Sequence, residues 1–89
     1  MKDKFLFELT DGWALLYDNR QWMICRARKR HAQEVWHPVS FIESTKTALL
    51  VCMRQKGIVP TPEAQAKLDK MPERFRDWLQ EHLGGNVNG

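Results

Sequence analysis

Apolar and polar residues alternate along much of the first half of the chain with a period of two. This period is typical of β-strands that bury one face, because successive side chains of a strand point to opposite sides. The pattern therefore predicts a four-stranded antiparallel meander. The expected strands are residues 5–10, 13–18, 21–30 and 34–42.

The segments between these strands carry turn signals. Asp11-Gly12 is a dipeptide favoured in two-residue type I′ turns, and Asn19-Arg20 separates the second strand from the third. A looser turn is expected near His31-Ala32. Pro38 donates no backbone hydrogen bond, so we expect the fourth strand to be an edge strand or to be interrupted there.

The second half of the chain changes to a helical pattern. Ser44 or Thr45 can cap a helix that runs through residues 54–56. Thr61 can cap a second helix, with Pro62 at its first position, where a missing N–H costs nothing.

Pro72 is expected to end the second helix, and apolar residues recur at helical spacing over 75–83. The order of elements predicts an α+β fold: a four-stranded antiparallel meander followed by two or three C-terminal helices, with the first helix packed on one sheet face. A single domain is expected over residues 1–85, with a disordered tail at 86–89.

Two-residue turns fix which residues face each other across the sheet, and therefore which side chains share a face. The two-residue turns place Glu8 opposite Leu15. If the same register continues past the looser third turn, Trp22 lies opposite Phe41. One face is then almost purely apolar, and we expect the first helix to pack on it through Ala48, Leu49, Cys52 and Met53. This expected core face contains Phe5, Phe7, Leu9, Ala14, Leu16, Met23, Cys25, Ala27 and Trp36.

The opposite face mixes charged residues with large aromatic ones. An open antiparallel sheet usually presents a polar face to water, so this face needs a cover or a partner. The last helix could cover it with Phe75 and Trp78, a second copy of the chain could, or a functional partner could.

Composition narrows the class of protein. The 43% hydrophobic and 28% charged residues are typical of an ordinary globular domain. Apolar runs such as residues 48–53 are too short to cross a membrane, and the first residues do not resemble a signal peptide, so a cytoplasmic protein is expected. Cys25 and Cys52 lack metal-site spacing and are expected to be thiols.

Charge is distributed unevenly along the chain. The formal net charge is +3, but residues 1–56 carry ten Lys/Arg against six Asp/Glu, whereas residues 57–89 carry four against five. The first half is therefore +4 and the second −1. The excess is modest for a dedicated duplex-DNA-binding protein, and it also suits a protein partner.

The densest basic segment lies in the third strand. Arg26, Arg28 and Arg30 alternate, so they should project to one side, and the register places Arg26 opposite His37. Such a basic and aromatic surface suits stacking on bases or docking to a protein, although a hairpin tip kept soluble by charge is an equal alternative. The predicted binding residues are Trp13, Tyr17, Trp22, Arg26, Arg28, Arg30 and His37.

No catalytic or cofactor signature accompanies this surface. His31, His37 and His82 are scattered and lack the spacing that brings metal ligands together on a helix. The chain has no glycine-rich phosphate loop, and its carboxylates alternate with basic residues as on a solvated helix face. We therefore expect a non-enzymatic binding protein with no metal and no cofactor.

Residues 21–57 resemble the AP2-like arm-binding domain of phage integrases. The order of basic strand, turn, strand and helix is similar, and Thr45-Lys46-Thr47-Ala48 matches the T-K-x-A sequence that opens the helix in that family. The resemblance implies a sheet that enters the DNA major groove with a helix packed behind it. It would make Arg26, Arg28 and Arg30 the contact residues.

The whole chain also resembles small orphan proteins of phages and other mobile elements, in its size and its lack of catalytic residues. Anti-CRISPR proteins are the best-known kind. This resemblance implies an inhibitor that occupies the surface of a host defence complex, so the expected partner is a host protein or nucleoprotein. The DNA-binding domain is the alternative, and a homodimer remains open.

Overall fold

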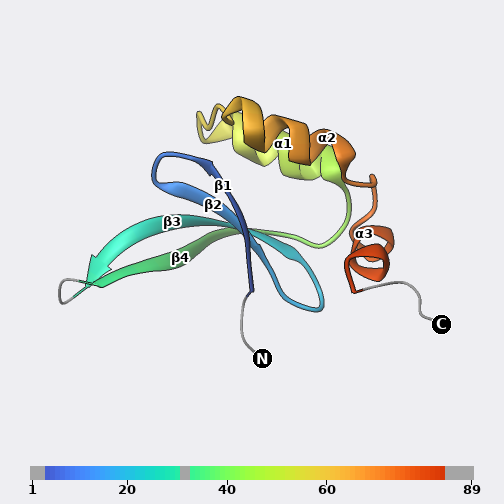
Figure 1. Ribbon diagram of the computed structural model, residues 1–89, viewed down its shortest axis with the longest axis horizontal. Coiled ribbons are helices and arrows are strands. Elements are labelled where there is room, and N and C mark those ends of the chain that lie inside the picture. The colour runs from blue at the N-terminus through green and yellow to red at the C-terminus, as the bar shows by residue number, and fades with distance from the viewer. Residues whose placement is uncertain (1–3, 31–32, 84–89) are drawn as a thin grey trace.

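The computed structural model describes residues 4–30 and 33–83 (Figure 1). Its strands form one antiparallel sheet in the order β1-β2-β3-β4, and three helices follow, so the predicted α+β meander is confirmed. The expected turn at His31-Ala32 and the expected tail at 86–89 lie outside the described residues. The elements are β1 (Lys4–Thr10), β2 (Trp13–Tyr17), β3 (Trp22–Arg30), β4 (Gln33–Ile42), α1 (Lys46–Gln55), α2 (Pro62–Lys70) and α3 (Phe75–His82).

Two bulges in β1 change the register that the sequence predicts. Leu6 and Leu9 are extra residues in the pairing of β1 with β2, so Glu8 lies opposite Ala14 instead of Leu15. A bulge lets two neighbouring residues of one strand oppose a single residue of the other. Leu9 is thereby fully buried beneath the helices, although the expected alternation placed it on the other face.

A third bulge lies in the edge strand β4. Val39 is the extra residue there, next to Pro38, whose position on an edge strand agrees with its missing N–H. Beyond this bulge Trp22 faces Ile42, whereas Phe41 was expected opposite it. Ile42 is buried with the helices as a result, and Phe41 points to the opposite face, where 57% of its surface is exposed.

The first two helices begin as the capping residues predict. The Thr45 hydroxyl accepts a hydrogen bond from the Ala48 N–H at 3.2 Å, and the Thr61 hydroxyl accepts one from the Ala64 N–H at 3.1 Å. Each satisfies a backbone donor that the first helical turn leaves unpaired. Pro62 occupies the first position of α2, as expected.

The start of α1 is joined to the end of α2 through Lys46. Its ammonium group donates hydrogen bonds to the backbone carbonyls of Leu68 (3.1 Å) and Met71 (2.8 Å). A cation at this position satisfies carbonyls at the C-terminal end of a helix and complements its dipole. The Glu73 carboxylate in turn accepts a hydrogen bond from the Thr47 N–H at 3.0 Å. The lysine of the T-K-x-A sequence therefore holds the helices together.

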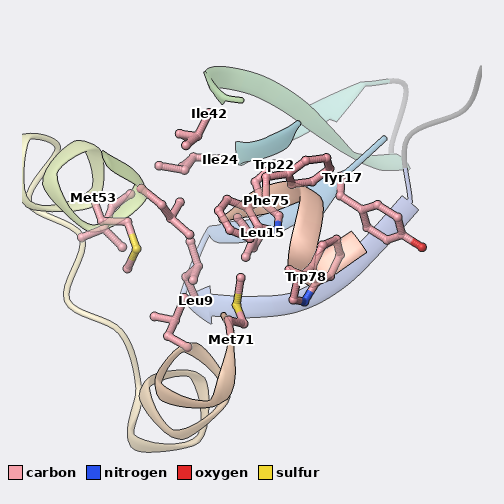
Figure 2. Packing of buried hydrophobic residues seen from close by; sticks show 13 residues of the cluster. Leu9, Leu15, Tyr17, Trp22, Ile24, Ile42, Met53, Met71, Phe75 and Trp78 are labelled. Atoms are coloured by element: carbon pink, nitrogen blue, oxygen red, sulfur yellow. The ribbon is translucent and has the colours of Figure 1, made fainter. Parts of the chain in front are cut away.

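The helices cover the sheet face that carries Leu15, Tyr17 and Trp22 (Figure 2). The Trp22 ring meets the Phe75 ring edge-on, with 5.1 Å between ring centroids, and Tyr17 meets Trp78 in the same way at 5.0 Å. Such edge-to-face pairs are favoured by the charge distribution of aromatic rings. The last helix is therefore the cover, which is one of the three possibilities that the sequence left open.

The first helix packs on one sheet face, as expected, but not on the face that the sequence predicted. We expected α1 on the face of Leu16 and Met23, but its Leu49 and Met53 join the large cluster on the opposite face. Both faces of the central strands are apolar, so alternation alone does not indicate which one the helices cover. The large cluster consists of Leu9, Leu15, Tyr17, Trp22, Ile24, Ile42, Leu49, Met53, Ile58, Leu68, Met71, Phe75 and Trp78.

The opposite side of the sheet, called here the open face, holds a second, smaller cluster to which no described helix contributes. Ala14 and Cys25 are fully buried at its centre. The Phe5 ring of β1 and the Trp36 ring of β4 lie 6.0 Å apart, although they come from the two edge strands. Because the small residues lie between these strands on the same face, the two rings shield them. The open face consists of Phe5, Ala14, Leu16, Met23, Cys25, Ala27, Trp36, Pro38 and Phe41.

Candidate functional site

The hairpin formed by β3 and β4 extends beyond the rest of the sheet. β2 begins at Trp13, which pairs with Arg26, and the Ala27 N–H donates to the Gly12 carbonyl at 2.9 Å. From Ala27 to Arg30, β3 pairs with β4 alone. This two-stranded part, residues 27–30 with 33–36, is called here the ribbon. It points away from all three helices (Figure 1).

The hairpin carries the whole net charge of the chain. Residues 26–37 contain four Lys/Arg and one Asp/Glu, which gives +3. The remaining residues contain ten of each kind and are therefore neutral. A positive potential concentrated on a protruding element attracts anionic partners and guides their approach.

Two arginines of this hairpin lie on the same sheet face as the helices. Arg26 pairs with His37 across the strands, as predicted, and Arg28 pairs with Val35. The guanidinium of Arg26 lies over the Trp13 ring, 5.3 Å from its centroid. Stacking of this kind fixes the group while its in-plane N–H donors remain available to a phosphate or a carboxylate.

These arginine side chains are accessible. Arg26, Arg28 and His37 are exposed, and no carboxylate among the described side chains forms an ion pair with either arginine. Arg30 continues the same alternation at the end of β3, but its side chain lies outside the described part of the structure. The described site therefore consists of two exposed arginines: Arg28 on the ribbon, and Arg26 at the base of the ribbon over the Trp13 ring.

Two of the predicted binding residues are not at this surface. Tyr17 and Trp22 are buried beneath α3, in contact with Phe75 and Trp78, so their assignment to a binding surface is wrong. Trp13 is half-buried and contributes through its contact with Arg26. The expected aromatic and basic surface thus divides into a buried aromatic core and a basic hairpin.

The arrangement also differs from the one that the integrase resemblance implies. In that arrangement a helix packs behind the sheet face that meets DNA. Here α1 lies on the same face as Arg26 and Arg28, since its Leu49 packs in the cluster of Leu15 and Trp22. The arginines are accessible because the hairpin extends past the helices (Figure 1).

Sequence reasoning missed a second exposed feature, on the open face. Phe5 and Phe41 are 53% and 57% exposed, and Trp36, which belongs to the ribbon, is half-buried with its ring 6.0 Å from that of Phe5. The signal was present in the sequence: the residues expected beneath the first helix include Ala14, Cys25 and Ala27, which are small enough to be shielded by neighbouring rings.

The described residues hold little that points to catalysis. They contain no group of three or more His, Cys, Asp or Glu side chains that could hold a metal ion. The His82 ring is stacked on Trp78, with 4.7 Å between centroids, and meets Tyr17 edge-on. Cys25 belongs to the open-face cluster and Cys52 packs on the helix side, so the sheet separates them. None of the described helices is both long and apolar enough to span a membrane.

Comparisons of the chain with protein-family models, with curated proteins and with solved structures gave no match.

Proposed function

We propose that the protein is a non-enzymatic binding protein and that its β3–β4 hairpin binds nucleic acid through the phosphate backbone. The observation that carries this proposal is the concentration of the entire net charge of +3 in residues 26–37 of a protruding hairpin. Phosphate contacts by Lys and Arg supply most of the affinity of sequence-independent nucleic-acid binding.

The shape of the hairpin supports the same function. A two-stranded ribbon is narrow enough to lie with its arginine side along one phosphate backbone, either of a duplex or of a single strand. Arg26 and Arg28 are two residues apart on one strand, so their guanidinium groups follow each other along the ribbon. This spacing suits successive phosphates of one backbone.

Binding is tested by fluorescence anisotropy with labelled duplex and single-stranded DNA at about 50 and 200 mM salt. Two phosphate contacts on duplex DNA make the affinity fall by an additional factor of about 12 over this fourfold rise in salt. The double variant Arg26→Ala/Arg28→Ala is expected to lose this part of the salt dependence and to bind more weakly at the lower salt concentration.

The matched control is Arg54→Ala/Arg76→Ala, which removes the same charge from exposed positions on α1 and α3. A general charge effect predicts equal losses in the two double variants, and equal losses would refute the hairpin as the contact site. Absence of measurable binding to either form of DNA at low salt would refute the function itself.

A steric inhibitor of a host defence complex is the second candidate. The observation in its favour is that Val35, the neighbour of Arg28 across the strands, is 41% exposed, and Val39 is 40% exposed. Arginine beside exposed apolar side chains is common in protein interfaces. This candidate predicts no DNA binding, and co-purification of a host protein complex that Val35→Ser together with Arg28→Ala disrupts.

A further inference from the structure

The open face of the sheet presents aromatic rings next to the basic ribbon. Phe5 and Phe41 are each more than half exposed, and Trp36 lies directly opposite Ala27, inside the charged hairpin. The other exposed large apolar side chains of the described chain are all aliphatic. Exposed rings on a four-stranded sheet are a general means of holding unpaired bases, because every base has a face that can stack.

We infer that the open face is a stacking platform for the bases of single-stranded nucleic acid, with Phe5, Trp36 and Phe41 as the rings. The inference rests on the proposed function and specifies its ligand class. A strand held by its phosphates at the basic ribbon has its bases within reach of Trp36, the ring that belongs to both the hairpin and the open face.

The positions of charge and rings select a single strand over a duplex. Arg26 and Arg28 lie on the helix side of the sheet, whereas Trp36 and Phe41 lie on the open face. A ligand that contacts both must cross the edge of the ribbon. Duplex DNA has a persistence length of about 150 base pairs and does not bend around an element two strands wide without a large cost, but a flexible single strand does.

Charge complementarity favours a nucleic acid over a protein with an apolar surface. Two carboxylates have register positions on the open face: Glu8, opposite Ala14, and Glu34, opposite the cation Lys29. The adjoining hairpin contributes +3. A polyanion that carries aromatic bases complements both features at once, since its phosphates meet the cations and its bases meet the rings.

The test replaces rings by an apolar side chain of different shape. Phe5→Leu/Phe41→Leu keeps the patch hydrophobic but removes two stacking faces, and both sites are exposed enough for the fold to tolerate the change. Affinity for an oligothymidine strand is expected to fall about tenfold for each base that loses its ring. Affinity for a duplex of the same length is expected to stay within twofold. Val59→Ala, at a 76% exposed apolar position outside the sheet, is the control.

Tryptophan fluorescence provides a second measurement. Trp22 and Trp78 are buried, so quenching by the oligonucleotide must come from the half-buried Trp13 and Trp36. Trp36→Phe retains a stacking ring, and it is expected to lose most of the quenching while it keeps the affinity within a few-fold.

The outcomes separate this inference from the function on which it rests. Loss of oligothymidine binding in both the ring and the arginine variants supports both. Loss in Arg26→Ala/Arg28→Ala with no effect of Phe5→Leu/Phe41→Leu overturns the platform and leaves the nucleic-acid function standing. Equal weakening of duplex and single-strand binding by the ring variant also overturns the platform. Absence of binding to any nucleic acid overturns both.

Discussion

Replacing Lys46 by methionine removes a charged group from the junction of α1 and α2 while leaving a long apolar side chain in its place. The Lys46 ammonium donates to the Leu68 and Met71 carbonyls at 3.1 and 2.8 Å. In the variant both carbonyls lose this donor at the point where α2 ends, and the start of α1 loses its attachment there.

The structure sets the size of the effect. A hydrogen bond to a charged group contributes about 1.5–3 kcal/mol, so two give an upper range of about 3–6 kcal/mol. Lys46 is only half-buried, and water can replace part of what is lost. We therefore expect Lys46→Met to lower the free energy of unfolding by about 2–3 kcal/mol, as for single changes with a named structural cause. For a domain of this size that corresponds to a fall in Tm of roughly 8–24 °C.

Urea unfolding followed by circular dichroism measures this loss, with Lys56→Met as the matched control. Lys56 is exposed just after α1, and its expected effect is within about 0.5 kcal/mol. Equal stability of the two lysine variants would refute the role assigned to Lys46. Both remove one positive charge, so both should lower nucleic-acid affinity by the same small factor.

Two further changes test the fold that holds the hairpin. Hydrogen bonds from the Thr47 side chain and backbone N–H lower the pKa of Glu73 from its ordinary value of 4.5. The ionised carboxylate therefore stabilises the folded state above pH 4.5, and this stabilisation is lost as the pH falls through the lowered pKa. Unfolding midpoints of the protein and of Glu73→Gln are therefore expected to differ at neutral pH and to converge in acid, and a constant difference down to low pH would contradict the assignment. Phe75→Ala should cost about 3–5 kcal/mol because the ring is buried against Trp22, whereas Leu83→Ala at a 65% exposed position should cost little; similar midpoints in urea would be inconsistent with α3 as the cover.

Local signals in the sequence were sufficient to predict the strands and helices and their order. Asp11-Gly12 specifies a turn because Gly12 adopts a φ of +84°, and the caps Thr45 and Thr61 start their helices as expected. These predictions depend on neighbouring residues only. They are confirmed because side-chain capping and turn geometry act over a few positions.

The assignment of faces failed because it depends on choices that alternation does not record. Bulges at Leu6 and Leu9 shift the register inside a strand whose apolar sequence gives no sign of them, and Pro38 indicated an interruption near Val39 but not its effect on the register. The predicted pairing of β3 with β4 is correct up to this bulge, since Arg26 does lie opposite His37. The slip occurs further along β4, which explains why Phe41 left the face on which it was expected.

The aromatic residues of the central strands distinguish the two apolar faces. Tyr17 and Trp22 pack edge-on against Trp78 and Phe75 of α3, whereas the buried residues of the other face form a cluster with Trp36 to which no described helix contributes. The helices therefore pack on the face that carries Tyr17 and Trp22. The aromatic side chains of the face that they leave open become the second part of the candidate site.

The hairpin carries arginines on one side and an aromatic ring on the other. A single strand that crosses the ribbon edge is bound by the arginines and the rings together, so removing the arginines also weakens its contact with the rings, and removing the rings weakens its contact with the arginines. Combining Arg26→Ala/Arg28→Ala with Phe41→Leu should then cost less affinity for oligothymidine than the sum of the separate losses, because each change already frees part of the strand. For a duplex, which meets only the arginine side, the combined variant should behave like the arginine variant alone. Strict additivity on oligothymidine would mean that the charge and the rings contribute independently, which contradicts a strand held across the ribbon edge by both.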